Sequence, residues 1–75
     1  MVSRHRALTN LGINLRRQRD ACSLTQEGLA EKADLDPTYI SGIERGLRNP
    51  SILSVVRLAR ALEITLSDLF RGIDA

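Results

Sequence analysis

Residues 24–50 read LTQEGLAEKADLDPTYISGIERGLRNP, and they predict two short helices with a very tight turn between them. Apolar residues recur at helical spacing in residues 26–33 and again in residues 37–45. Each segment has its own start signal: Thr25 is a suitable N-cap for the first, and Asp36 followed by proline suits the second. The stretch therefore predicts a helix-turn-helix unit.

Three further helices are predicted around this pair. Their apolar spacing places them at about residues 8–21, 52–62 and 66–71, and Ser51 and Thr65 are N-cap candidates for the last two. Alternation of apolar and polar residues nowhere outweighs the helical period, so no strand is expected. The fold class that follows is all-α, a compact bundle of about five short helices.

Individual residues predict details of the helix ends and faces. Asp34 lies where the chain must reverse and tolerates left-handed backbone angles, and Gly46 is a C-terminal cap candidate. The inward face of residues 52–62 is expected to consist of Ile52, Val55, Val56, Ala59 and Leu62, while Leu53 and Leu58 lie off its centre.

The composition limits the function classes. The chain has 75 residues, which is one domain at most, and 43% hydrophobic residues suit a globular fold. Aromatic residues make up only 3%, which argues against a stacking platform for single-stranded bases. The net charge is only +2, but all of the 11 Lys and Arg residues except Lys32 are arginine, which favours bidentate contacts with phosphate or guanine.

Residues 1–7 are expected to be a flexible basic tail, and residues 8–75 a single domain. The tail could reach a DNA groove, but a solvated tail is the favoured interpretation. His5 has no companion ligands, so neither a metal site nor another cofactor is expected.

Cys22 should be a free, buried or partly buried thiol. No signal peptide and no membrane-length apolar segment are visible, which favours a cytoplasmic protein.

Polar residues early on the predicted second helix of the unit are placed to meet base edges. In a helix-turn-helix that docks in the major groove, these positions are Thr38, Tyr39 and Ser41. Thr38 can offer a hydroxyl or a methyl group, and Tyr39 can bond to a base or a phosphate or can be a half-buried packing residue. Gly42 is costly inside a helix, so we interpret it as clearance for DNA, or as simply tolerated.

Further residues flank this helix on both sides. Arg45 and Arg48 can reach guanine or phosphate. Thr25 and Gln26 lie at the start of the preceding helix, whose free amides favour an anion, so they should bind a phosphate. Asn49 would help from the opposite side or stabilise the turn.

The sequence resembles the Xre/Cro/C1-type helix-turn-helix family over roughly residues 9–71. The matching residues are Thr25–Gln26, Leu29–Ala30, Tyr39–Ser41, Ile43–Gly46, Arg48–Ser51, Leu58–Ala59, Ala61–Leu62 and Leu66–Phe70. The resemblance implies a lambda-repressor-like bundle, and residues 35–45 look most like the controller proteins of restriction–modification systems. Asp34 replaces the glycine usual at the turn, and Pro37 stands where several controllers carry a basic residue.

The resemblance also implies an ion pair between Arg19 and Glu44. A carboxylate beside a polyanion would be repelled unless it were neutralised and turned inward, so we expect this pair to be partly buried.

A homodimer is expected because the apolar residues of the last two helices exceed what one small bundle covers. The predicted dimer interface consists of Leu53, Ile64, Leu66, Leu69, Phe70 and Ile73. Two copies of the recognition helix would then lie about 34 Å apart, matching half-sites one turn of double-stranded DNA apart.

The leading hypothesis is a transcription regulator that binds an inverted-repeat operator in double-stranded DNA as a homodimer. An antitoxin that sequesters a protein partner is the alternative, but it would need a segment outside the bundle. An enzyme is disfavoured because no paired carboxylates or phosphate-binding loop are visible. Glu31 and Lys32 are surface charges that could touch RNA polymerase, although nothing in the sequence selects this partner.

Overall fold

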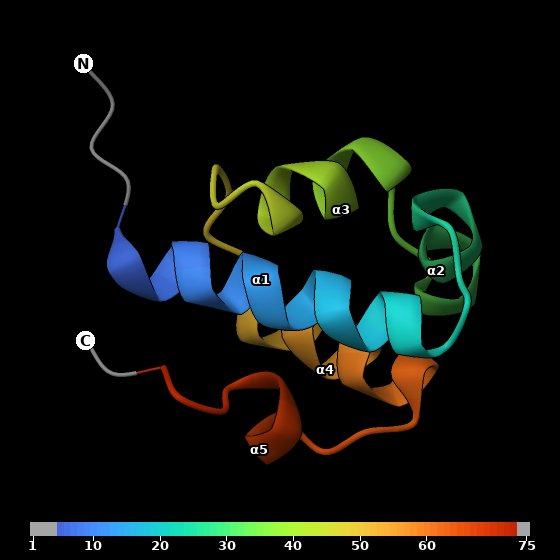
Figure 1. The fold of residues 1–75 in the computed structure, drawn as a ribbon. Coiled ribbons are helices and arrows are strands. Elements are labelled where there is room, and N and C mark those ends of the chain that lie inside the picture. Colours follow the sequence, from blue (N-terminus) through green and yellow to red (C-terminus); the bar gives the residue numbers. More distant parts are fainter. Residues whose placement is uncertain (1–4, 74–75) are drawn as a thin grey trace.

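Five helices follow one another in residues 5–73, the part of the chain that the computed structural model describes (Figure 1). They are α1 (Arg6–Ala21), α2 (Gln26–Ala33), α3 (Pro37–Glu44), α4 (Ile52–Leu62) and α5 (Leu66–Leu69). No strand occurs among the described residues, so the predicted all-α fold is confirmed. Within the same residues, no helix combines the length and the apolar composition that crossing a bilayer requires.

The predicted N-cap residues start their helices. The side chains of Thr25, Asp36 and Ser51 each accept a hydrogen bond from an amide in the first turn of α2, α3 and α4. Thr65 and Asp68 form a reciprocal capping box at α5. Because these caps satisfy amides that a helix leaves without partners, they fix where each short helix begins.

Two helix boundaries differ from the predictions. The Nδ1 atom of His5 accepts a hydrogen bond from the amide of Ala7 at 3.2 Å, so α1 begins at Arg6 and not at residue 8. Residues 5–7 were therefore wrongly assigned to a flexible tail, and residues 1–4 lie outside the described residues. At the other end of the chain, α5 ends at Leu69 and does not reach Arg71.

Several helices end on a residue in the left-handed conformation. Gly46 has this conformation after α3, with φ 73°, as predicted for a C-terminal cap. Asp34 adopts it at the turn between α2 and α3, with φ 56° and ψ 49°. Ser23 and Glu63 do the same after α1 and α4. Asp34 therefore accommodates the reversal that the family usually gives to glycine.

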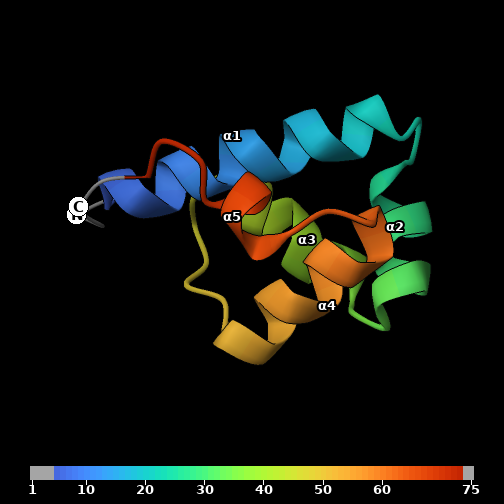
Figure 2. The same ribbon diagram turned by 90° about the horizontal axis from the view of Figure 1, so that it is seen from below.

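Helices α3 and α5 both pack on α1, and α2 and α4 complete the bundle (Figures 1 and 2). Contacts join α1 to α3 and α5, α2 to α3 and α4, and α4 to α5, so α3 lies on one side of α1 and α5 on the other. The core between them consists of Leu11, Leu15, Leu29, Ala30, Ala33, Ile40, Ile43, Val55, Leu58, Ala59, Leu62 and Leu69.

The inward face of α4 differs from the prediction. Leu58 is only 1% exposed, whereas Ile52 is 68% exposed. The buried residues Val55, Leu58, Ala59 and Leu62 follow a regular helical stripe. Ile52 belongs to the same stripe, but the first turn of α4 extends beyond the helices that cover the rest (Figure 2).

Close packing of α1 on α3 depends on Gly12. This residue is buried, and a β-carbon on it would overlap the backbone carbonyl groups of Ile43 and Glu44. Backbone atoms cannot make room by a change of rotamer, as a side chain can. Gly12 therefore sets how closely α1 approaches the C-terminal end of α3.

Replacing Glu63 with glycine should raise the free energy of unfolding by about 0.5–1 kcal/mol. Glu63 is exposed and has φ 56°, a conformation that strains a residue with a β-carbon and does not strain glycine. Urea denaturation followed by far-UV circular dichroism measures the change. Glu63→Ala is the control, because it removes the charge and keeps the β-carbon. An equal gain in both variants would assign the effect to charge and contradict this explanation.

Candidate nucleic-acid interface

Helix α3 has one buried side and one polar side. Ile40 and Ile43 are 0% and 1% exposed and anchor the helix on the core. Thr38 is exposed, and Tyr39 and Ser41 are half-buried. The three residues predicted to face base edges therefore remain accessible from outside the bundle.

The hydroxyl of Thr38 is already engaged as a donor. Its Oγ1 atom donates to Oδ1 of Asp36 at 2.6 Å, and its backbone amide donates to the same oxygen at 2.8 Å. These two hydrogen bonds lower the pKa of Asp36, the side-chain bond having the larger effect. Thr38 thus presents the lone pairs of its oxygen and its methyl group outward, and the expectation that its hydroxyl is freely available needs this correction.

In the protein without DNA, the Arg48 side chain fills the space beside Gly42, so the interpretation of Gly42 as clearance for DNA stays a prediction. Gly42 is buried, and the atoms that a β-carbon would meet belong to the side chain of Arg48. The Arg48 guanidinium lies 5.7 Å from the centre of the Tyr39 ring, within the range of a cation–π contact. The sequence analysis missed this arrangement, because Arg48 follows the helix in the chain and folds back over it.

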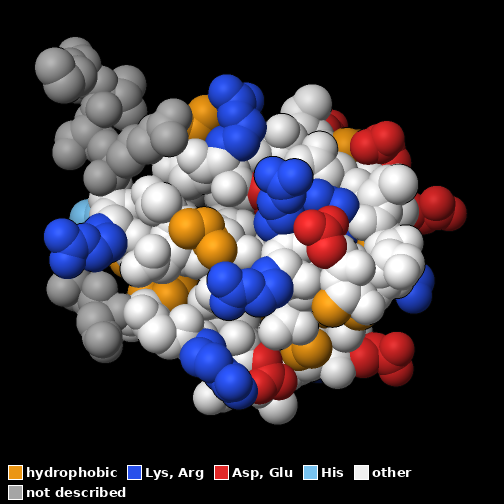
Figure 3. Space-filling view, in the orientation of Figure 1, with side chains coloured by type: hydrophobic (Ala, Val, Ile, Leu, Met, Phe, Trp, Pro, Cys, Tyr) orange, Lys and Arg blue, Asp and Glu red, His pale blue; other side chains and the backbone are white. Residues whose placement is uncertain are grey.

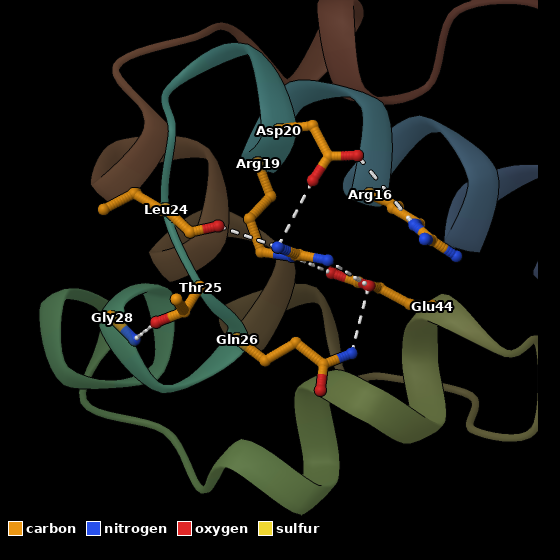
Figure 4. A network of polar contacts seen from close by, with 8 residues as sticks. All are labelled: Arg16, Arg19, Asp20, Leu24, Thr25, Gln26, Gly28 and Glu44. Carbon is orange, nitrogen blue, oxygen red and sulfur yellow. Dashed lines mark hydrogen bonds and ion pairs between the residues drawn. The ribbon is translucent and has the colours of Figure 1, made fainter.

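A buried carboxylate joins three segments of the fold (Figure 4). Glu44 at the end of α3 accepts hydrogen bonds from Nε of Arg19 at 2.6 Å and from Nη2 of Arg19 at 3.0 Å. It also accepts from Nε2 of Gln26 at 3.1 Å. The Arg19 and Glu44 side chains are 12% and 4% exposed, so the expected pair is present and buried. The hydrogen bond to Glu44 raises the pKa of Arg19, which keeps its charge.

The remaining bonds of Arg19 explain why α1 and α2 keep their relative position. Its Nη1 atom donates to the backbone oxygen of Leu24 at 2.7 Å. Leu24 lies between α1 and the Thr25 cap of α2. One guanidinium therefore fixes the linker between α1 and α2 as well as the end of α3.

The residues predicted to bind phosphate lie at the start of α2 and after α3. Thr25 is exposed, and its Oγ1 atom accepts from the amide of Gly28 at 2.9 Å, which leaves its hydroxyl hydrogen free to donate. Gln26 is half-buried and gives one of its two amide hydrogens to Glu44. Arg45 and Asn49 are exposed.

The charges of the surface are unevenly distributed (Figure 3). Lys and Arg side chains are spread over the face formed by α1 and α3, and most of the visible Asp and Glu side chains lie along the edge at α2. The acidic residues of α2 and its end are Glu27, Glu31 and Asp34. Around α3 the surface is therefore better suited to a polyanion than the edge at α2.

An exposed apolar surface lies on α4 and α5. Leu53 is 73% exposed, and Leu66 and Phe70 are 38% and 36% exposed. Ile64 and Ile73 are partly buried against the core. Leu69, which we assigned to a dimer interface, is 0% exposed, because it points into the bundle between α1 and α4.

Cys22 also differs from its prediction, because it is exposed and not buried. It caps the end of α1, and its Sγ atom lies 3.9 Å from the backbone oxygen of Leu62.

Replacing Glu44 with alanine should cost about 3–5 kcal/mol of stability, because it leaves the Arg19 guanidinium buried without its carboxylate. The thermal unfolding midpoint should fall by more than about 10 °C. Asp20→Ala is the matched control: Asp20 also pairs with Arg19, at 3.4 Å, but its side chain is 61% exposed. That exposed pair should contribute less than about 1 kcal/mol. Equally small losses in both variants would contradict the assigned role of Glu44.

Comparison with known proteins gives the family. The Helix-turn-helix family model matches residues 15–69. Control protein C.MunI of Mycoplasma sp is 42% identical over 57 residues, which are 76% of this chain and 77% of that protein.

Solved structures of controller proteins have the same fold. The restriction–modification controller protein C.AhdI from Aeromonas hydrophila is 42% identical, with a TM-score of 0.86 over 88% of this chain and 100% of its own. The C.Esp1396I controller, solved as a tetramer in complex with its natural operator, is 36% identical, with a TM-score of 0.83 over 92% of this chain and 91% of its own. This chain therefore belongs to the Xre/Cro/C1-type helix-turn-helix family and is similar to restriction–modification controller proteins.

Proposed function

We propose that this protein is a transcription regulator that binds a specific sequence in double-stranded DNA and acts as a restriction–modification controller. One observation carries the proposal: α3 is anchored by a buried apolar side and presents Thr38, Tyr39 and Ser41 on its accessible side. Arg45 and Arg48 flank this side. A helix of this kind docks in the major groove with its early residues at base edges.

The chemistry of each side chain limits what it reads. Arginine makes bidentate contacts with the O6 and N7 atoms of guanine, so Arg45 and Arg48 favour guanine or a phosphate. Thr38 accepts hydrogen bonds through its oxygen, because its hydrogen is held by Asp36. It therefore favours an exocyclic amino group of adenine or cytosine, or a thymine methyl group against its own methyl.

Phosphate contacts fix the position of α3 without selecting a sequence. At the start of α2, the Thr25 hydroxyl and the first-turn amides without helical partners can donate to a phosphate, and the helix dipole also favours an anion there. Gln26 supplies its second amide hydrogen there, and Asn49 contributes from beyond α3. Two phosphates bound on opposite sides of the groove would hold the helix at a constant depth.

A homodimer supplies the second half-site contact. Leu53, Leu66 and Phe70 leave an apolar surface on α4 and α5, which a second copy would cover by two-fold symmetry. Ile52, which is 68% exposed, extends this surface. The C.Esp1396I controller was solved as a tetramer in complex with its natural operator, which supports assembly of this chain on DNA. An inverted-repeat operator follows from the symmetry of such a dimer.

Selection from random duplex DNA should yield a symmetric motif, and its affinity should fall steeply with salt because bound arginines release counterions. Arg45→Ala should weaken binding to this motif by about 1–3 kcal/mol, which is roughly 5- to 150-fold. Arg60→Ala on α4 is the control, because it removes an exposed arginine that lies outside α3 and the loop after it. Binding without any sequence preference would exclude a specific regulator.

Leu53→Asp should convert the dimer to a monomer at micromolar concentration, because it places a charge in an apolar interface. Analytical ultracentrifugation measures the change. Ile13→Asp is the control, since Ile13 is 49% exposed on α1, beside the hollow that Glu44 lines. A wild-type protein that is monomeric with and without DNA would refute the proposed dimer.

A further inference from the structure

Gly42 lies in the last turn of α3, on the side of the helix that Arg48 covers. A β-carbon at this position would come within 2.6 Å of Cγ and 3.3 Å of Nε of Arg48. Real β-carbons essentially never come as close as the shorter distance, so no other residue leaves the Arg48 side chain where it is. Arg48 itself is exposed, and it could move into solvent if Gly42 were replaced.

The end of α3 explains why Arg48 takes this path. The amide of Leu47 donates to the oxygen of Gly42 at 2.9 Å, and the amide of Gly46 donates to the oxygen of Ile43 at 3.0 Å. These two bonds form a Schellman motif, in which the residue at the position of Leu47 normally packs on a side chain at the position of Gly42. Glycine offers no such side chain, so Leu47 stays 43% exposed. The stem of Arg48 lies over Gly42 instead.

The head of the Arg48 side chain has its own partners. Its guanidinium lies over the Tyr39 ring at 5.7 Å from the centre. Asp36, at the start of α3, is close enough for the charge of Arg48 to act on its carboxylate. The side chain thus runs back along α3 from beyond its C-terminal end toward its first turn.

We propose that Gly42 is a positioning residue, which holds Arg48 against Tyr39 on the outer side of α3 before DNA binds. This inference rests on the proposed function, because its purpose is to order a DNA-contacting group in advance. An arginine side chain loses considerable rotamer freedom when it binds, and a side chain that is already ordered loses less. Gly42 therefore acts on DNA affinity through Arg48 and touches no base itself.

The arrangement can be tested in the free protein. Tyr39 is the only tyrosine and the chain has no tryptophan, so its ring is well suited as a single reporter. In nuclear magnetic resonance spectra, the side-chain protons of Arg48 should be shifted by the ring of Tyr39. Gly42→Ala should abolish this shift. A shift that persists in Gly42→Ala would show that Arg48 does not depend on the glycine, and would overturn the inference.

DNA binding gives the second test, performed with the full chain and the selected duplex. Gly42→Ala should weaken specific binding about tenfold. The thermal midpoint should stay the same or rise, because alanine suits a helix better than glycine. A lower thermal midpoint together with a lower affinity would indicate a structural defect and would contradict the inference.

A double variant distinguishes positioning from direct clearance for DNA. At low salt, where Arg48→Ala still binds, adding Gly42→Ala to Arg48→Ala should cause no further loss. A further tenfold loss in the double variant would mean that the new methyl group clashes with DNA, and would overturn the inference. If the wild-type chain selects no motif, the proposed function itself fails, whereas unchanged affinity in Gly42→Ala refutes only the role of Gly42.

Discussion

The Glu44 carboxylate is the contact on which the recognition unit depends. It ends α3, and it receives donors from Arg19 on α1 and from Gln26 on α2. A carboxylate this close to a DNA-binding surface would repel phosphate if it were free. Burial against a guanidinium neutralises the charge of the Glu44 carboxylate. The buried carboxylate then fixes the orientation of α3 relative to α1 and α2.

The buried contacts of Glu44 also order a side chain of the proposed DNA-binding surface. Gln26 gives one amide hydrogen to Glu44, which orders its side chain and leaves the other hydrogen for the proposed phosphate contact. The close approach at Gly12 also fixes the C-terminal end of α3, because backbone atoms of α1 and α3 meet there. The proposed phosphate-binding end of α2 and the base-facing side of α3 thus belong to one rigid unit, which suits a site that must match a fixed groove.

Sequence reasoning located helices well and located surfaces less well, for a physical reason. N-caps such as Thr25 and Asp36 are local signals, because a side chain bonds an amide two or three residues away. His5 is an unusual cap and gave no such signal, so the start of α1 was missed. Whether Ile52 and Leu69 are exposed depends on where neighbouring helices stop, which helical periodicity does not encode. The family resemblance predicted the Arg19–Glu44 pair, and the need to neutralise a carboxylate near a polyanion agreed with it without selecting the partner.

The proposed reading surface combines α3 with the loop that follows it, which is compatible with a proline at the start of the helix. Pro37 has no polar side chain, so the first helical position offers no hydrogen bond to a base, whereas the family resemblance implies a basic residue there in several controllers. Arg48 folds back over Gly42, so its guanidinium lies over the Tyr39 ring. A cation from the loop is thereby brought toward the N-terminal half of α3, where Pro37 provides none. Operator preference in this protein should therefore depend on the loop after α3 as much as on the helix itself. We propose that a loop residue takes this role because the helix surface beneath it, at Gly42, carries no side chain.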